Sequence, residues 1–123
     1  MTEALLAPFD EDLLATVAGR HDTDEATLRD LLRRHQQQVR DNPGVEDIVY
    51  EWRSQFHGQP VLRRTEDTYY LRLHTHVWDE FAAALDIPEA SLHAVLDTHE
   101  EQLRRETGAS VGDDERAMVL NRP

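Results

Sequence analysis

The chain has 123 residues and a formal net charge of -12 at pH 7, from 25 acidic and 13 basic side chains, and every basic residue is Arg. The absence of Cys and Lys excludes disulfides, thiolate nucleophiles, Cys-ligated zinc and Schiff-base chemistry. The length fits one domain, no apolar run could cross a membrane, and the first residues lack the basic start of a signal peptide. We therefore expect a single-domain cytoplasmic protein.

The composition resembles that of proteins from salt-in halophilic archaea, which are acidic and poor in Lys and Cys. A physical reason supports the resemblance. Carboxylates hold water strongly, and multimolar salt shortens the screening length to about 3 Å, so their mutual repulsion costs little. The resemblance covers the whole chain, implies a halophilic acidic protein and points to no particular family.

An internal repeat occupies the two ends of the chain. Residues 13–40 align without gaps with residues 77–104. Each copy predicts a short helix, a turn and a longer helix, because its apolar residues follow the i, i+3, i+4, i+7 spacing of one buried helix face. Asp22 and Asp86, each followed three residues later by Glu, are the expected N-caps of the longer helices.

A different unit lies between the copies. The apolar face of residues 45–56 predicts a third helix built around Trp52 and Phe56. Residues 61–64 and 68–73 then predict two antiparallel strands. The expected fold is mainly α with a small antiparallel β-hairpin, in the order α-α-α-β-β-α-α, with two similar helical hairpins flanking the central helix and β-hairpin. The expected core comprises Leu13, Leu14, Val17, Leu28, Leu31, Leu32, Val45, Ile48, Val49, Trp52, Phe56, Leu71, Leu73, Trp78, Phe81, Leu92, Val95, Leu96 and Leu103.

The helical domain is expected to span residues 1–107, with an extended C-terminal tail over 108–123. The apolar residues Met118, Val119 and Leu120 of this tail dock either on the body or on a partner. A two-stranded hairpin alone is marginally stable, so it must pack on helices or pair with another chain. This requirement motivates the hypothesis of a homodimer.

Positive charge concentrates in residues 53–76, which carry +2 against -14 for the rest of the chain. The planar fork of Arg matches a carboxylate or a phosphate at two points, and Tyr adds stacking surface. One interpretation is a hairpin that grips an acidic partner or a phosphate backbone. The other is that these Arg pair with the protein's own carboxylates. The candidate contact residues are Arg53, Arg63, Arg64, Tyr69, Tyr70 and Arg72.

The segment from Phe81 to Leu96 resembles the helix-turn-helix pattern of DNA-binding regulators. Ala82 is the small residue of the first helix, Ile87 the apolar turn residue, and Val95 an inward position of the second helix. The resemblance covers about 16 residues and implies a transcription regulator that binds DNA. The outward face of the second helix carries acidic residues and His, with no Arg to contact a guanine edge.

A second resemblance uses the middle unit. Three helices followed by an Arg-bearing β-hairpin resemble a winged helix, which implies that Arg53 lies on the recognition helix and that the hairpin arginines form the wing. DNA binding through either motif is the alternative to a non-enzymatic regulatory module with an acidic protein partner, which is the function we favour from the sequence.

Two further function classes are weaker. His74 and His76 lie two residues apart at a strand end, and His35 and His99 occupy equivalent positions of the repeat, so either pair is a weak candidate for metal binding. Hydrogen-bonded structural His is the preferred interpretation, and no cofactor is expected. The three Ser residues lie outside any nucleophile-elbow motif, so we do not expect an enzyme.

Overall fold

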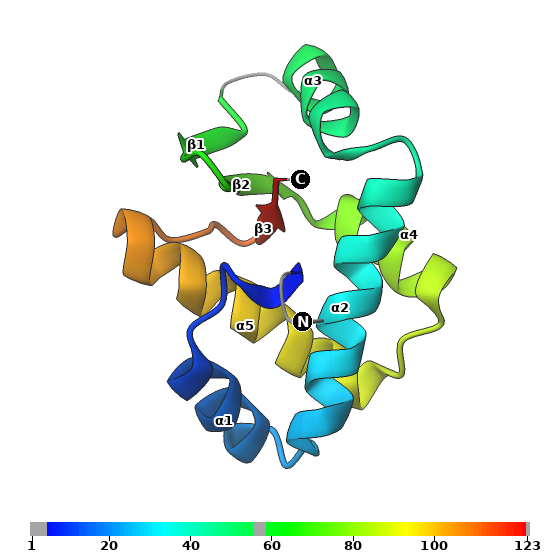
Figure 1. Ribbon diagram of the computed structural model, residues 1–123, viewed down its shortest axis with the longest axis vertical. Helices are drawn as coiled ribbons and strands as arrows, with labels where there is room; N and C mark the ends of the chain where they lie inside the picture. The colour runs from blue at the N-terminus through cyan, green and yellow to red at the C-terminus, as the bar shows by residue number, and fades with distance from the viewer. Residues whose placement is uncertain (1–4, 56–58, 123) are drawn as a thin grey trace.

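The computed structural model describes residues 5–55 and 59–122, and it confirms a mainly helical chain with a small antiparallel sheet (Figure 1). The seven expected elements occur in the expected order and are followed by one more strand. The elements are α1 (Glu11–Arg20), α2 (Glu25–Asp41), α3 (Val45–Gln55), β1 (Val61–Arg64), β2 (Thr68–His74), α4 (Thr75–Leu85), α5 (Glu89–Thr107) and β3 (Glu115–Asn121). Among the described residues, no helix is long and apolar enough to cross a membrane.

The additional strand β3 lies in the segment 108–123, which was expected to be an extended C-terminal tail. The sheet has the order β1-β2-β3, and β3 pairs antiparallel with the whole of β2, so that Val119 lies opposite Tyr70. The residues from Ala117 to Asn121 are buried. The apolar tail residues therefore dock on the body of the same chain, and the folded unit extends to β3 instead of ending at residue 107.

The outer edge of β3 is sealed by side chains of the surrounding helices. The indole Nε1 of Trp78 donates to the carbonyl of Ala117 at 2.8 Å, and the amide of Val119 donates to Nδ1 of His99 at 2.9 Å. The Gln36 side-chain amide donates to the Val119 carbonyl and accepts from the Asn121 amide, both at 2.8 Å. These side chains satisfy backbone groups that a further strand would otherwise pair with.

Helices cover both faces of this sheet (Figure 1). Adjacent residues of a strand point to opposite faces. From β2, the Tyr69 hydroxyl contacts Glu46 of α3, while from β1 the Arg63 side chain, opposite Tyr70, contacts the carbonyl of Glu106 in α5. Because both faces are covered, β2 is buried at nearly every position instead of alternating between buried and exposed residues.

The expected core is largely found. Fourteen of its residues are buried, and Ile48, Phe81, Leu92 and Leu96 are partly buried and pack against it. Phe56 lies outside the described residues. The expected core did not include β3, whose Met118, Val119 and Leu120 are fully buried.

The two copies of the repeat share one turn geometry, although the predicted N-caps are wrong. The longer helices begin after Asp24, whose side chain accepts from the Thr27 amide, and after Pro88. Asp22 and Asp86 lie earlier, in the left-handed conformation with φ of 53° and 55°. In both copies the Asp amide donates three residues back and the next amide five residues back, as in a Schellman motif that ends the first helix.

This geometry predicts a difference between two substitutions at Asp86. The left-handed conformation is free of steric cost for Gly and unfavourable for Ala. We expect Asp86→Gly to be more stable than Asp86→Ala by about 1 kcal/mol, as measured by urea unfolding. Both variants remove the same charge, so the difference reports on the backbone. Equal stabilities would contradict the assigned turn.

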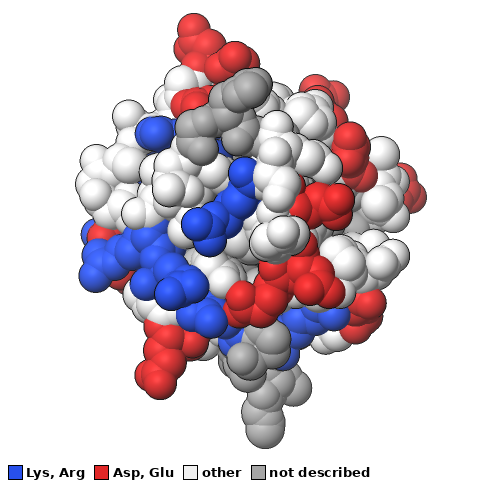
Figure 2. Space-filling model, turned by 90° about the horizontal axis from the view of Figure 1, so that it is seen from above, with Lys and Arg blue, Asp and Glu red and all other residues white. Residues whose placement is uncertain are grey.

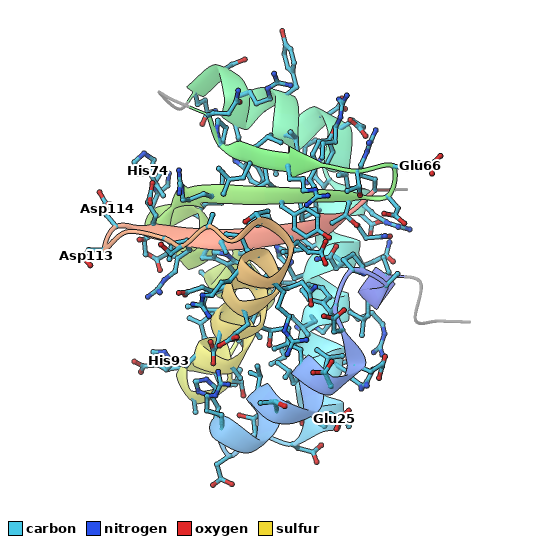
Figure 3. All side chains as sticks on the ribbon, turned by 90° about the vertical axis from the view of Figure 1, so that its left-hand side faces the viewer. Glu25, Glu66, His74, His93, Asp113 and Asp114 are labelled. Atoms are coloured by element: carbon cyan, nitrogen blue, oxygen red, sulfur yellow. The ribbon has the colours of Figure 1, made fainter. Side chains whose placement is uncertain are left out.

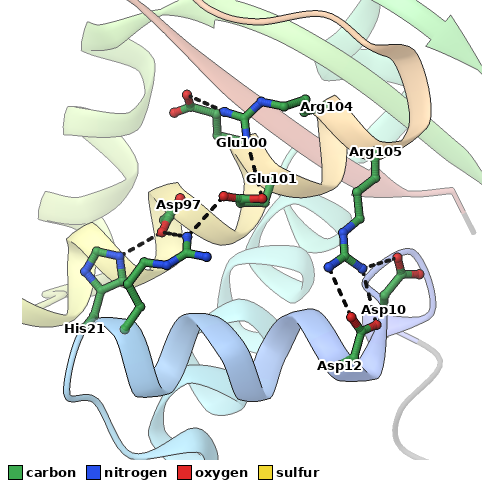
Figure 4. Close-up of polar contacts among 9 residues, drawn as sticks. Asp10, Asp12, His21, Asp97, Glu100, Glu101, Arg104 and Arg105 are labelled. Atoms are coloured by element: carbon green, nitrogen blue, oxygen red, sulfur yellow. Dashed lines mark hydrogen bonds and ion pairs between the residues drawn. The ribbon is translucent and has the colours of Figure 1, made fainter.

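Ion pairs hold α1 against α5 (Figure 4). Arg20 lies 2.8 Å from Asp97 and 3.1 Å from Glu101, while at the other end of α1 Arg105 lies 3.1 Å from Asp12. The hydrogen bond from Arg105 is the main cause that lowers the pKa of the Asp12 carboxyl. Each ion pair this exposed to solvent contributes little to the free energy of unfolding. The pairs therefore orient α1 relative to α5 more than they stabilise the domain.

Candidate functional site

Two of the four arginines in the cationic segment donate to backbone carbonyls of the chain itself. Arg63 donates to the carbonyl of Glu106 at 2.8 Å, in the last turn of α5. Arg72 donates to the carbonyl of Ser110 at 3.1 Å and lies 3.7 Å from the Glu115 carboxylate. Cations near a helix C-terminus satisfy its last carbonyls. Arg63 and Arg72 are therefore held by the chain itself, Arg63 through a backbone carbonyl and Arg72 through a carbonyl and the Glu115 carboxylate.

Tyr69 and Tyr70 do not form the exposed stacking surface expected from the sequence. Only 4% of Tyr69 and 5% of Tyr70 is exposed. The two side chains point to opposite faces of β2, and helices cover both faces, so neither ring is available for a base or an aromatic partner. Tyr69 nonetheless forms part of a pocket wall.

The other two arginines, Arg53 and Arg64, line one pocket of about 240 Å³. Arg53 comes from the last turn of α3 and Arg64 from the end of β1, and Gln59, Val61 and Tyr69 complete the described wall. Both arginines are exposed. Arg64 also donates to the Tyr69 hydroxyl, whereas no hydrogen bond or ion pair engages the Arg53 guanidinium within the described residues. In the view of Figure 2, blue side chains lie at several places over the left, centre and lower part of this face, and red side chains lie mainly along the top, the right and the lower half.

Register explains why only one of two adjacent arginines reaches this pocket. Arg64 lies opposite Tyr69 and shares its face of the sheet, on the side of α3. Arg63 lies opposite Tyr70 and faces α5. A β-bulge between Val61 and Arg63 returns Val61 to the α3 side. The sequence identifies both arginines but not their opposite directions.

A polar network extends from Tyr69, which lines the pocket, to Glu46 and Arg122, neither of which was expected from the sequence. The Tyr69 hydroxyl donates to Glu46, whose other oxygen accepts from Arg122 Nε at 3.0 Å. The bond from Tyr69 is the main cause that lowers the pKa of the Glu46 carboxyl. Burial, followed by Glu46, raises the pKa of Tyr69. No sequence signal joins Glu46 to Arg122, because their contact depends on the placement of β3.

A comparison with known protein families identifies the family of this chain. A family model described as "Domain of unknown function (DUF8048)" matches residues 7–122. The chain belongs to this family. The matched range runs from just before α1 through β3, so the DUF8048 domain includes the C-terminal strand. No curated protein and no solved structure matches the chain.

The two equivalent histidines of the DUF8048 domain meet in its core. The ring centroids of His35 and His99 lie 5.3 Å apart in an edge-to-face arrangement, and both side chains are 0% exposed. Burial lowers the pKa of His35 to about 3, and burial followed by the neighbouring His35 lowers that of His99 well below its ordinary value. Both rings are therefore neutral at pH 7 and pack as aromatic groups, with His35 4.5 Å from the Trp78 ring.

The other histidine pair lies at the end of β2. The rings of His74 and His76 stack at 5.9 Å, and Figure 3 shows His74 at the same end of the sheet as Asp113 and Asp114. Among the residues that the structure describes, no group of three or more His, Asp or Glu side chains is arranged to hold a metal ion. The geometry therefore gives neither His pair further support as a metal site.

The basic residues of the first helical hairpin of this DUF8048 domain are also engaged by the chain. Arg29 pairs with Glu11 and Glu25, and Arg33 lies 3.6 Å from Asp30. Arg34 donates to the carbonyl of Leu85 at 2.8 Å, in the last turn of α4. In the second hairpin, the outward residues of α5 include Glu89 and His93. The surfaces that a helix-turn-helix protein would turn towards DNA thus offer few uncommitted cations.

Proposed function

We propose that this domain is a non-enzymatic binding module that holds a carboxylate of an acidic protein partner between Arg53 and Arg64. One observation carries the proposal. Two exposed guanidinium groups from separate elements line a single pocket, in a protein whose other described arginines mostly contact its own carboxylates and carbonyls. A planar guanidinium binds a carboxylate at two points, so a pair of them forms a directional anion site.

The remaining wall of the pocket fits binding better than catalysis. Gln59 offers an amide and Val61 an apolar contact, while the Tyr69 hydroxyl is already committed to Glu46. Catalysis of acyl or phosphoryl transfer needs a nucleophile or a positioned base within reach of the bound group. The described pocket residues supply recognition groups for an anion and no such pair.

An acidic protein fits this site better than DNA does. Binding to a duplex uses several phosphate contacts spread along the backbone, and its affinity falls steeply with salt. Here the two pocket arginines form one local pair, and Glu46, Asp47 and Glu51 are exposed on the same helix as Arg53. DNA binding through a winged helix remains the alternative, and the test below includes it.

The test compares binding by the double variant Arg53→Ala/Arg64→Ala with binding by the wild type. Fluorescence anisotropy would follow a labelled 12-residue Glu-rich peptide and a random-sequence DNA duplex, each in 0.15 M and 2 M KCl. We expect the wild type to bind the peptide and the double variant to bind it about tenfold or more weakly, because it loses two charge-assisted contacts.

The matched control is Arg20→Ala/Arg33→Ala, which removes the same charge from ion pairs on α1 and α2. This control should keep the wild-type affinity, provided that circular dichroism shows all three proteins to be folded. An equal loss in both double variants would mean that net charge, and not the pocket, governs binding. Tighter binding of the duplex than of the peptide would replace this proposal with the DNA-binding alternative.

The homodimer is a separate proposal with its own measurement. The hairpin was expected either to pack on helices or to pair with another chain, and β3 of the same chain now pairs with β2. Light scattering in 2 M KCl gives the mass directly. A dimer mass would require an interface other than the β3 side of β2.

A further inference from the structure

The sheet has one edge at which the described chain leaves backbone groups open. The outer edge of β3 is occupied by the side chains of Trp78, His99 and Gln36. The opposite edge is β1, since the strand order is β1-β2-β3. In Figure 1, α3 and α5 lie over the two faces of the sheet, and no other labelled helix or strand runs along the outer edge of β1.

The pairing of β1 with β2 fixes which of its backbone groups point outward. The amide of Thr65 donates to the carbonyl of Thr68 at 2.8 Å, where the hairpin closes. In an antiparallel ladder, residues alternate between bonding to the partner strand and pointing away from it. Arg64, which lies opposite Tyr69, is therefore at a position whose amide and carbonyl point away from β2. A strand added beside β1 would pair with these groups.

The same register places the anion pocket beside this edge. The Arg64 side chain lies on the α3 side of the sheet, where Arg53 lines the same pocket. Alternate side chains of an added strand point to that side. Backbone pairing with Arg64 would therefore bring a side chain of the added strand to the mouth of the pocket that Arg64 itself lines.

Charge determines which strand fits this edge. β1 is four residues long, carries a bulge, and ends in the adjacent Arg63 and Arg64. Short length, bulges and charge protect edge strands against association with uncharged strands. A second copy of β1 would place arginines opposite arginines, which is destabilising, whereas carboxylates on the incoming strand would be attracted.

We propose that the acidic partner binds as an extended segment that adds a fourth strand beside β1 and places one carboxylate between Arg53 and Arg64. Such strand addition draws affinity from backbone hydrogen bonds and specificity from alternate side chains. The inference rests on the proposed function, because it assigns a binding mode and a partner class to the same pocket. The inference also requires that the partner segment can form backbone hydrogen bonds with β1 along one of the segment's edges.

The test uses an eight-residue peptide that alternates Glu and Thr and is capped at both ends. Two derivatives carry backbone N-methyl groups, one on every Glu and the other on every Thr. In a strand, alternate residues present their amides to the same edge. We expect one derivative to bind at least tenfold more weakly than the unmethylated peptide and the other to bind with nearly its affinity. Hydrogen exchange at the Arg64 amide should slow at least tenfold when the unmethylated peptide is present.

The possible outcomes separate the two proposals. If both derivatives bind as tightly as the unmethylated peptide, and Arg53→Ala/Arg64→Ala abolishes that binding, strand addition is overturned and the anion pocket stands. If the unmethylated peptide and the Glu-rich peptide of the first test both fail to bind, both proposals fall. Slow exchange at Arg64 in the free protein, together with a dimer mass, would mean that a second copy already occupies this edge and would also overturn the inference.

Discussion

The free energy of unfolding is expected to fall by about 4 kcal/mol when the pH is lowered from 7.5 to 5, because two buried histidines bind protons only after unfolding. His35 has a folded pKa of about 3, and the pKa of His99 is also lowered by burial. Their ordinary pKa is about 6.5, so the unfolded state binds more protons below that pH. Stability is therefore complete above pH 6.5 and is lost progressively as the pH falls towards the folded pKa of His35.

This pH window is distinct from that of the carboxylates. Ion pairs and hydrogen bonds lower the pKa of Glu11, Asp12 and Glu46, so the stability they contribute is lost only below their ordinary pKa of about 4. A loss between pH 6.5 and pH 5 therefore reports on the histidines. Urea unfolding followed by circular dichroism, at constant KCl and at several pH values, measures it.

The variant His35→Phe tests the assignment. It keeps an aromatic ring against Trp78 and removes one of the two protonation sites, so the slope of stability against pH should fall to about half. His93→Phe is the control, because His93 is exposed on α5. A slope that is the same in His35→Phe and in the wild type would show that the acid sensitivity arises elsewhere.

Replacing Gln36 by Leu is expected to destabilise the domain by about 2–4 kcal/mol, because two buried backbone groups lose their partners. The Gln36 amide bonds the Val119 carbonyl and the Asn121 amide at the sealed edge of β3, and only 1% of this residue is exposed. Leu has a similar volume and fills the space without offering a donor or an acceptor. Urea unfolding measures the loss.

The neighbouring Gln37 provides the control for this prediction. Gln37 is exposed, and its amide bonds Asp41 within the same helix, so Gln37→Leu should change stability by less than about 0.5 kcal/mol. Hydrogen exchange adds a local readout, because the Asn121 amide should exchange faster in Gln36→Leu. Comparable stabilities of the two variants would contradict the role assigned to Gln36 at the β3 edge.

Local patterns were enough to predict seven of the eight elements, and the eighth shows where such patterns fail. The helices follow apolar periodicity, and β1 and β2 are marked by turn residues and β-branched or aromatic side chains. β3 carries the continuous apolar run from Ala117 to Leu120, which lacks the alternation of a half-exposed strand. That run is explained by burial on both faces, and such burial depends on helices that are distant in the sequence.

The candidate site was predicted only in part, because its geometry also depends on contacts between elements that are distant in the sequence. The charge pattern selected Arg53 and Arg64, and these two residues line the pocket. It also selected Arg63, although the bulge and the register of β1 turn this side chain towards α5. Glu46 carried no sign of a role beside the pocket, because its contact with Tyr69 depends on how α3 crosses the sheet.

The position of β3 has a consequence for the order in which the domain is completed. A ribosome synthesises this segment after every other element, yet β3 lies in the core and pairs along the whole of β2. Until Asn121 has emerged, β2 exposes one open edge, and His99 and Gln36 lack the backbone groups that they bond. The helices therefore cannot reach their final packing before β3 is synthesised, and the folding of this domain is completed when β3 pairs with β2.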